Sequence, residues 1–140
     1  MCRYPLGPPG SIAGVTDALA EDFWREALSA AHRRGALPLE GSAEQRVLDL
    51  IEASGVEVGV ALVVCLALTA PKDDFALAVL GAGPIETLLE HYVNAAARPL
   101  AAAAAKHEEV AQALRAAVPP RLDQTATRLL APWLRTEQRG

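Results

Sequence analysis

The stretch from Leu77 to Tyr92 reads Leu-Ala-Val-Leu-Gly-Ala-Gly-Pro-Ile-Glu-Thr-Leu-Leu-Glu-His-Tyr and holds the densest local signals of the chain. Its first glycine, Gly81, follows an apolar segment, and a glycine commonly ends a helix. Gly83, Pro84 and Glu86 then match a helix start, because proline suits the first helical position and glutamate suits the positive end of a helix. The pattern predicts a structural corner formed by Gly81, Gly83, Pro84 and Glu86, with one helix before it and another after it.

On the N-terminal side of this corner, residues 58–70 form the longest apolar run, with 13 residues. A strand usually has about 4–8 residues, so the length of the run favours a helix. A helix that is apolar on every side lies in the middle of a bundle. We therefore expect a central helix over residues 56–70, in which Gly59 either weakens the helix by about 1 kcal/mol or lets a neighbour approach closely.

Capping residues and apolar spacing predict the other helices. We expect a first helix over residues 17–34, with Thr16 as its N-cap and Gly35 as its end, and a second over residues 43–54, where Ser42 and Gln45 match a capping box. Asp73 is the expected cap of the short helix before Gly81.

Beyond the corner, we expect a break or kink at Arg98 and Pro99, because proline disrupts a helix interior. The alanine-rich segment that follows is expected to form one helix over residues 101–118. Asp123 is the expected cap of the last helix.

These elements predict an all-α fold. We expect a single helical domain over residues 16–135, built as an orthogonal or antiparallel bundle or a short solenoid-like stack of about six to seven helices. Residues 1–15 are rich in proline and glycine and are expected to form a flexible arm, and residues 136–140 a tail.

The segment from Leu77 to Leu89 resembles the signature LxxLGAGPLExLL of an uncharacterised bacterial all-helical domain family, a domain of unknown function. The resemblance extends over residues 42–133 and is specific around the glycines. It implies an all-α fold, and because the family has no known function, no catalytic residue can be carried over from it. The chain departs from the family at Tyr92, where the family has glycine, and in lacking a tryptophan in the apolar helix.

Composition excludes several classes of function. Residues 1–97 carry 6 Lys/Arg against 13 Asp/Glu, whereas residues 98–140 carry 7 against 4. The acidic charge of residues 1–97 argues against nucleic-acid binding. We expect the basic part, residues 98–140, to face the acidic part of its own molecule. The apolar run is shorter than the roughly 20 residues that span a membrane. Cys2 and Cys65 are expected to be reduced thiols, which together with the absence of a signal-peptide pattern predicts a cytoplasmic protein.

Glu86, Glu90 and His91 form the best polar cluster in the sequence, because the two carboxylates share one helix face. A metal site in a bundle needs matching ligands from other helices, for which Asp73, Asp74, His32 and His107 are the candidates. We favour a solvated acidic face, with a metal or acid–base site as the alternative. The glycine-rich corner would favour an anion, but Glu86 opposes one.

The remaining polar and aromatic residues favour structural roles. His32 follows an apolar helix and precedes two arginines, which is typical of a helix end, and His107 is expected at a surface or a helix start. Cys65 lies within the apolar run, where a nucleophilic role is disfavoured. Trp24 and Trp133 are expected in the core or in a groove.

The sequence thus favours a non-enzymatic protein-interaction or accessory domain, of adaptor or immunity-like type, whose partner is another protein. It predicts no cofactor, no bound metal and no catalytic residue. The alternative is a small-molecule-binding or metal-binding domain, or an enzyme, that uses Glu86, Glu90 and His91. Helix pairs that leave grooves for a partner helix support the first hypothesis.

Overall fold

The computed structural model describes residues 13–28, 41–118 and 121–134, and these parts contain helices and no strand. The expected all-α fold is confirmed. The elements in chain order are α1 (Ala13–Ala27), α3 (Ala43–Ala53), α4 (Val56–Thr69), α5 (Asp74–Leu80), the π-helix η1 (Gly81–Ile85), α6 (Glu86–Tyr92), the 3-10 helix η2 (Val93–Ala96), α7 (Ala97–Lys106), α8 (Glu108–Ala116) and α9 (Gln124–Leu130).

Helix α4 lies at the centre of the bundle, as the apolar run predicts. It contacts α1, α3, α5, α6, α7 and α8, and every residue from Gly59 to Ala67 is buried. Full burial of a leucine or valine side chain contributes about 1.5–3 kcal/mol, so this run is a main source of stability. At Gly59, a Cβ would lie 2.7 Å from Leu88 Cδ1. The glycine is therefore the place where α6 approaches α4 closely.

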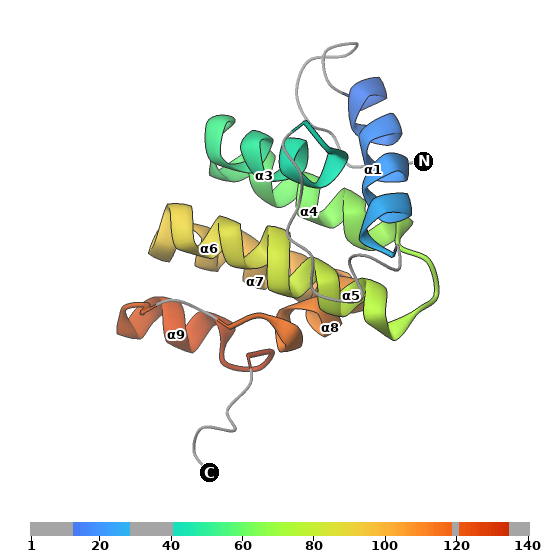
Figure 1. The fold of residues 1–140 in the computed structure, drawn as a ribbon. Helices are drawn as coiled ribbons and strands as arrows, with labels where there is room; N and C mark the ends of the chain where they lie inside the picture. The colour runs from blue at the N-terminus through green and yellow to red at the C-terminus, as the bar shows by residue number, and fades with distance from the viewer. Residues whose placement is uncertain (1–12, 29–40, 119–120, 135–140) are drawn as a thin grey trace.

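Residues 74–92 form one continuous helical rod, and the corner expected at Gly81 is wrong. The π-helix η1 joins α5 to α6 without a change of direction (Figure 1). Gly81 has φ −66° and ψ −44°, which are ordinary helical values, so it does not end a helix. Gly83 is not an N-cap, and Pro84 lies inside the helical rod rather than at its start.

The wide turn η1 explains how a proline fits inside the rod. Proline has no N–H and cannot form the regular bond to the residue four before it. The N–H of Glu86 instead reaches the Gly81 carbonyl, five residues back, which is the π-helical pattern. Buried residues recur at every fourth position through the rod: Ala76, Leu80, Pro84 and Leu88. In an α-helix of 3.6 residues per turn, residues spaced four apart move gradually around the helix. One wider turn brings them back toward a single face.

Gly81 is the point of contact between the rod and α8. A Cβ at this position would overlap the carbonyl oxygen of Ala113 and lie 3.1 Å from the Ala116 Cβ. Only a glycine permits this approach of two helix backbones. The glycine is therefore required by packing between helices and not by a turn.

Three expected caps are confirmed. The Ser42 side chain accepts a hydrogen bond from the Gln45 N–H, the Asp73 side chain accepts from the Phe75 N–H, and the Asp123 side chain accepts from the Ala126 N–H. The Gln45 side chain donates to Asp49 instead of turning back to the cap, so only half of the expected capping box forms. The positive φ of Gly55, +95°, separates α3 from α4 as expected.

Helix α1 begins earlier than expected. It starts at Ala13, so Thr16 lies inside the helix and is not its cap. The arm expected over residues 1–15 therefore overlaps the beginning of the helix. The expected helix end at residue 34 lies outside the described residues. Figure 1 shows α1 crossing the end of α4. Trp24 fixes this crossing, because its indole Nε1 donates to the Leu66 carbonyl at 3.1 Å inside the core.

The second half of the chain differs from expectation at two breaks. The first break occurs at Val93, which has φ +50°, and not at Arg98 and Pro99. Pro99 lies in the first turn of α7, where a missing N–H costs little. The second occurs at His107, whose extended backbone divides the expected helix over residues 101–118 into α7 and α8. Local composition favours helix on both sides of His107, so the division reflects packing rather than propensity.

Buried apolar residues of α1, α3, α4, the rod and α7 to α9 belong to one core cluster. The reduced thiol expected at Cys65 is wrong, because this fully buried residue is disulfide-bonded. An apolar run identifies a buried position but not the segment that lies against it. Among the described residues, no helix is both long and apolar enough to cross a membrane.

Candidate functional site

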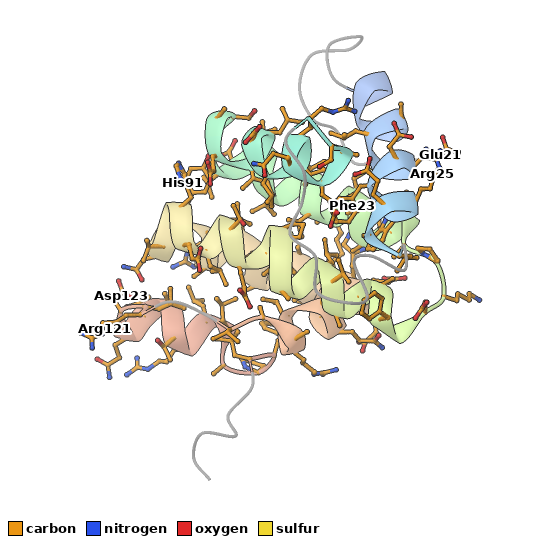
Figure 2. All side chains as sticks on the ribbon, in the orientation of Figure 1. Glu21, Phe23, Arg25, His91, Arg121 and Asp123 are labelled. Atoms are coloured by element: carbon orange, nitrogen blue, oxygen red, sulfur yellow. The ribbon has the colours of Figure 1, made fainter. Side chains whose placement is uncertain are left out.

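The residues predicted to form a polar cluster have separate surroundings. Glu90 and His91 are exposed, and Figure 2 shows His91 near the end of α6, on the outside of the bundle. The His91 ring packs edge-on against Tyr92, with ring centroids 4.6 Å apart. Glu86 is half-buried and faces a different partner. The shared helix face predicted by the spacing therefore does not become a pocket.

Glu86 is a structural anchor. Its Oε2 accepts a hydrogen bond of 2.7 Å from the backbone N–H of Val118, 32 residues further along the chain. This N–H follows the end of α8, so the carboxylate ties the rod to the next segment. The sequence predicted that Glu86 lies at the positive end of a new helix, where backbone amides are free. Those amides are not free, because the helix continues through η1.

Where the structure describes them, the other proposed ligands do not join a metal site. Within residues 13–28, 41–118 and 121–134, no group of three His, Cys, Asp or Glu residues could hold a metal ion. The Asp73 carboxylate caps α5, and His32 lies outside the described residues. The Arg25–Asp22 and Arg115–Glu108 ion pairs each lie within one helix. They do not join the acidic part of the chain to its basic part.

A groove between the first half of α4 and helix α7 is the more favourable site. Its volume is about 760 Å³, within the range of about 300–1,000 Å³ that is usual for ligand pockets. Its middle is apolar and mostly small. The residues that line this middle part are Val60, Ala61, Pro99, Ala102, Ala103 and Ala105.

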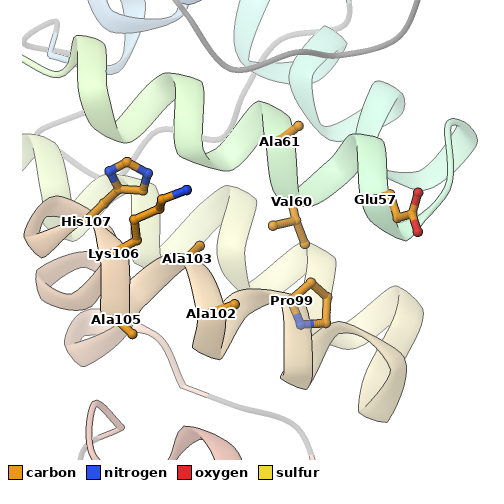
Figure 3. Close-up of a pocket in the computed structure, with 9 residues that line it drawn as sticks. All are labelled: Glu57, Val60, Ala61, Pro99, Ala102, Ala103, Ala105, Lys106 and His107. Carbon is orange, nitrogen blue, oxygen red and sulfur yellow. The ribbon is translucent and has the colours of Figure 1, made fainter.

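Charged residues stand at the two ends of this α4–α7 groove. Figure 3 shows Glu57 at one end and Lys106 with His107 at the other, with Val60 and Ala61 on the wall between them. Glu57 and Lys106 are exposed, so both charges remain hydrated while the groove is empty. The groove therefore has an acidic end, an apolar middle and a basic end.

His107 has an unusual environment at the basic end. Its Nε2 is buried and lacks a hydrogen-bond partner, the single side-chain nitrogen or oxygen in this state among the described residues. A buried polar atom without a partner costs about 1–3 kcal/mol. His107 holds this position because its extended backbone forms the junction between α7 and α8, while its carbonyl accepts from the Val110 and Ala111 N–H groups.

The lining of the groove contains few chemically reactive side chains. Among the described residues that line the groove there is no serine, threonine or cysteine, and its carboxylate lies at the opposite end from its imidazole. Nucleophilic catalysis needs a nucleophile and a base within hydrogen-bond reach. What this arrangement can supply is an apolar surface with a charge at each end.

A second hollow, of about 540 Å³, lies at the other end of α4. It borders α8 at Glu109 and Gln112 and contains Leu68, whose side chain is 40% exposed. The two hollows thus border the same central helix at its two ends. Both also adjoin the α7–α8 junction, because His107 and Glu109 are two residues apart.

Compared with protein-family models, curated proteins and solved structures, the chain gives no match. The groove and the orphan nitrogen of His107 are therefore the observations on which a function can be based.

Sequence reasoning missed Glu57 and Lys106 as site residues and treated His107 as a surface or helix-start residue. His107 does precede α8 as a helix start. The available signal was the alanine tract from Ala101 to Ala105, which ends in a lysine and a histidine. Alanines favour helix, but they also leave space beside a helix, and the space becomes visible only once α4 is placed opposite.

Proposed function

We propose that this chain is a non-enzymatic protein-interaction domain, of accessory, adaptor or immunity-like type, that binds a helical segment of another protein in the α4–α7 groove. The observation that carries the proposal is the alanine-lined middle of the groove between an acidic and a basic end. Small side chains support this occupant, because they let the backbone of a partner helix approach closely.

The dimensions of the groove support a short contact. The lining of α7 extends from Pro99 to Lys106, which corresponds to about 10 Å, or two helical turns. A partner helix would place apolar residues one turn apart against Val60 and Ala103 and would keep its polar face in water. A small apolar molecule is the alternative occupant, and the volume of the groove supports it as well.

The likeness of Leu77–Leu89 to the bacterial helical domain family is part of the same proposal, whereas the cytoplasmic location expected from the sequence is not. Neither adds an activity. The disulfide at Cys65 favours an oxidising compartment and therefore counts against the cytoplasm.

The test is selection of peptides from a displayed library of random 16-residue sequences with the purified full chain. Three proteins are compared: the wild type, Ala102→Trp and Ala53→Trp. Ala102 is exposed and lines the groove, so a tryptophan there fills it. Ala53 is an exposed alanine at the end of α3 that does not line the groove, and it serves as the matched control.

We expect peptides that bind the wild type and Ala53→Trp equally and bind Ala102→Trp at least tenfold more weakly. NMR shift changes on binding should concentrate at residues 57–61 and 99–107. Peptides that bind all three proteins equally, or a selection that enriches none, would overturn the proposal. Displacement of selected peptides by a metabolite panel would instead favour the small-molecule alternative.

A further inference from the structure

We propose that the basic end of the groove, formed by Lys106 and His107, receives a carboxylate of the bound segment. The inference rests on the proposed function, because it assumes that the groove takes a segment of another protein. It adds the chemistry that this segment must carry and the direction in which it lies.

The first observation is the buried Nε2 of His107, which has no hydrogen-bond partner although His107 lines the groove. An imidazole nitrogen is always a donor or an acceptor, so a buried one without a partner is costly. Rotation of the ring about its Cβ–Cγ bond exchanges the positions of its nitrogen and carbon atoms. A polar group that enters this end of the groove can therefore supply the partner that the protein itself does not.

The second observation is the sign of the neighbouring charge. Lys106 adjoins His107 in the chain and lines the same end of the groove with an exposed ammonium. An ammonium is a donor without acceptor capacity, so it selects an acceptor of negative charge. A carboxylate fits both groups, because its two oxygens can accept from the ammonium and from an imidazole N–H together.

The nearest acidic residues do not occupy this position in the described structure. The Glu108 carboxylate lies 3.9 Å from Arg115 and 3.5 Å from the Gln112 amide, both on its own helix α8. Glu109 lines the second hollow. Glu57 stands at the opposite end of the groove. Among the described residues, these carboxylates thus leave the basic end without an acidic group.

The charges also fix a direction. A segment whose carboxylate meets Lys106 and His107 has its other end beside Glu57, where a basic residue is favoured and an acidic one is repelled. A segment of reversed charge order would place like charges together at both ends. The groove therefore discriminates between partners by charge order as well as by apolar surface.

The experiment uses two probes of the same shape, 4-methylpentanoate and 4-methylpentanamide, titrated into the isotope-labelled full chain in a buffer free of other carboxylates. The branched chain represents a leucine-like side chain, and the amide lacks the charge. Amide-group shifts report the place of binding, and the ring carbon and proton signals of His107 report contact with the imidazole.

We expect the carboxylate to shift signals of residues 57–61 and 99–107 and to bind about tenfold or more tightly than the amide, since hydrogen bonds to charged groups are the stronger ones. Equal binding of the two probes in the groove would overturn the carboxylate inference and leave the proposed function standing. Absence of binding, or shifts elsewhere in the chain, would also overturn it, and peptide selection would then judge the proposed function separately.

Variants identify the groups responsible. Lys106→Gln and His107→Asn should each remove the preference for the carboxylate, whereas Lys72→Gln and His91→Asn, at exposed positions outside the groove, should retain it. Asparagine suits the helix start at His107. If His107→Asn does not fold, Lys106→Gln decides, because Lys106 is exposed and its replacement leaves the core unchanged. An unchanged preference in Lys106→Gln would refute the inference.

Discussion

Gly81 and Gly83 are two residues apart in the same helical turn, yet they have opposite surroundings. A Cβ on Gly81 would overlap the Ala113 carbonyl, whereas a Cβ on Gly83 would have no atom within 4 Å. Neither glycine has a positive φ. The difference between them is therefore one of space alone, and it can be measured by the same substitution at both positions.

We expect Gly81→Ala to lower the free energy of unfolding by about 1–3 kcal/mol, because the methyl group forces the rod away from α8. Gly83→Ala should raise it by about 0.4–1 kcal/mol, since alanine restricts the unfolded chain and fits the helix. Urea denaturation followed by circular dichroism measures both. Equal effects of the two substitutions would show that Gly81 is not a close contact.

Tyr92 is a second residue whose role comes from a distant segment. Its hydroxyl donates to the Ile51 carbonyl at 2.6 Å and accepts from the Gly55 N–H at 3.0 Å. It thereby satisfies backbone groups at the end of α3, which otherwise lack partners.

At the scale of elements, the rod of α5, η1 and α6 is held by contacts on two sides. Gly81 meets α8, and Glu86, one turn further, binds the Val118 N–H just beyond the end of α8. The rod and α8 therefore act as one unit. The wide turn η1 places both residues toward α8 while it keeps Leu80 and Leu88 in the core.

We predict that Glu86→Ala lowers the free energy of unfolding by about 0.5–1.5 kcal/mol, the usual contribution of one hydrogen bond, and that it speeds hydrogen exchange of the Val118 amide. Glu90→Ala, at an exposed position one turn away, should change stability by less than about 0.5 kcal/mol. NMR exchange rates at Val118 give the local measurement. Comparable losses for both variants would argue against the anchor.

At the scale of the whole molecule, stability depends on α4, which contacts α1, α3, α5, α6, α7 and α8. Leu66 of α4 is fully buried and its carbonyl accepts from Trp24 of α1, whereas Leu68, two residues further, is 40% exposed. The pair compares the same residue type on the same helix in the core and at the surface.

Leu66→Ala should lower the free energy of unfolding by about 2–5 kcal/mol through the cavity that it leaves, and Leu68→Ala should change it by less than about 0.5 kcal/mol. Thermal and urea unfolding, followed by tryptophan fluorescence and circular dichroism together, measure this difference. If α4 is the common core, both probes report one transition in Leu66→Ala; separate transitions would indicate that α1 unfolds independently of the rest.

The sequence by itself determined the helical class, the central position of residues 56–70 and the caps at Ser42, Asp73 and Asp123. These depend on local periodicity, hydrophobicity and side chains that bond their own neighbouring backbone. The sequence also indicated correctly that no membrane-spanning helix is present among the described residues.

Only the tertiary structure decided the roles of Gly81, Glu86 and His107. From the sequence alone, glycine and proline predict the end of a helix. At Gly81, however, the absence of a side chain permits the contact with Ala113 of α8, 32 residues further along the chain. The same holds for the candidate site. Glu57 and Lys106 are 49 residues apart, and a groove exists only where two helices are packed with small residues between them.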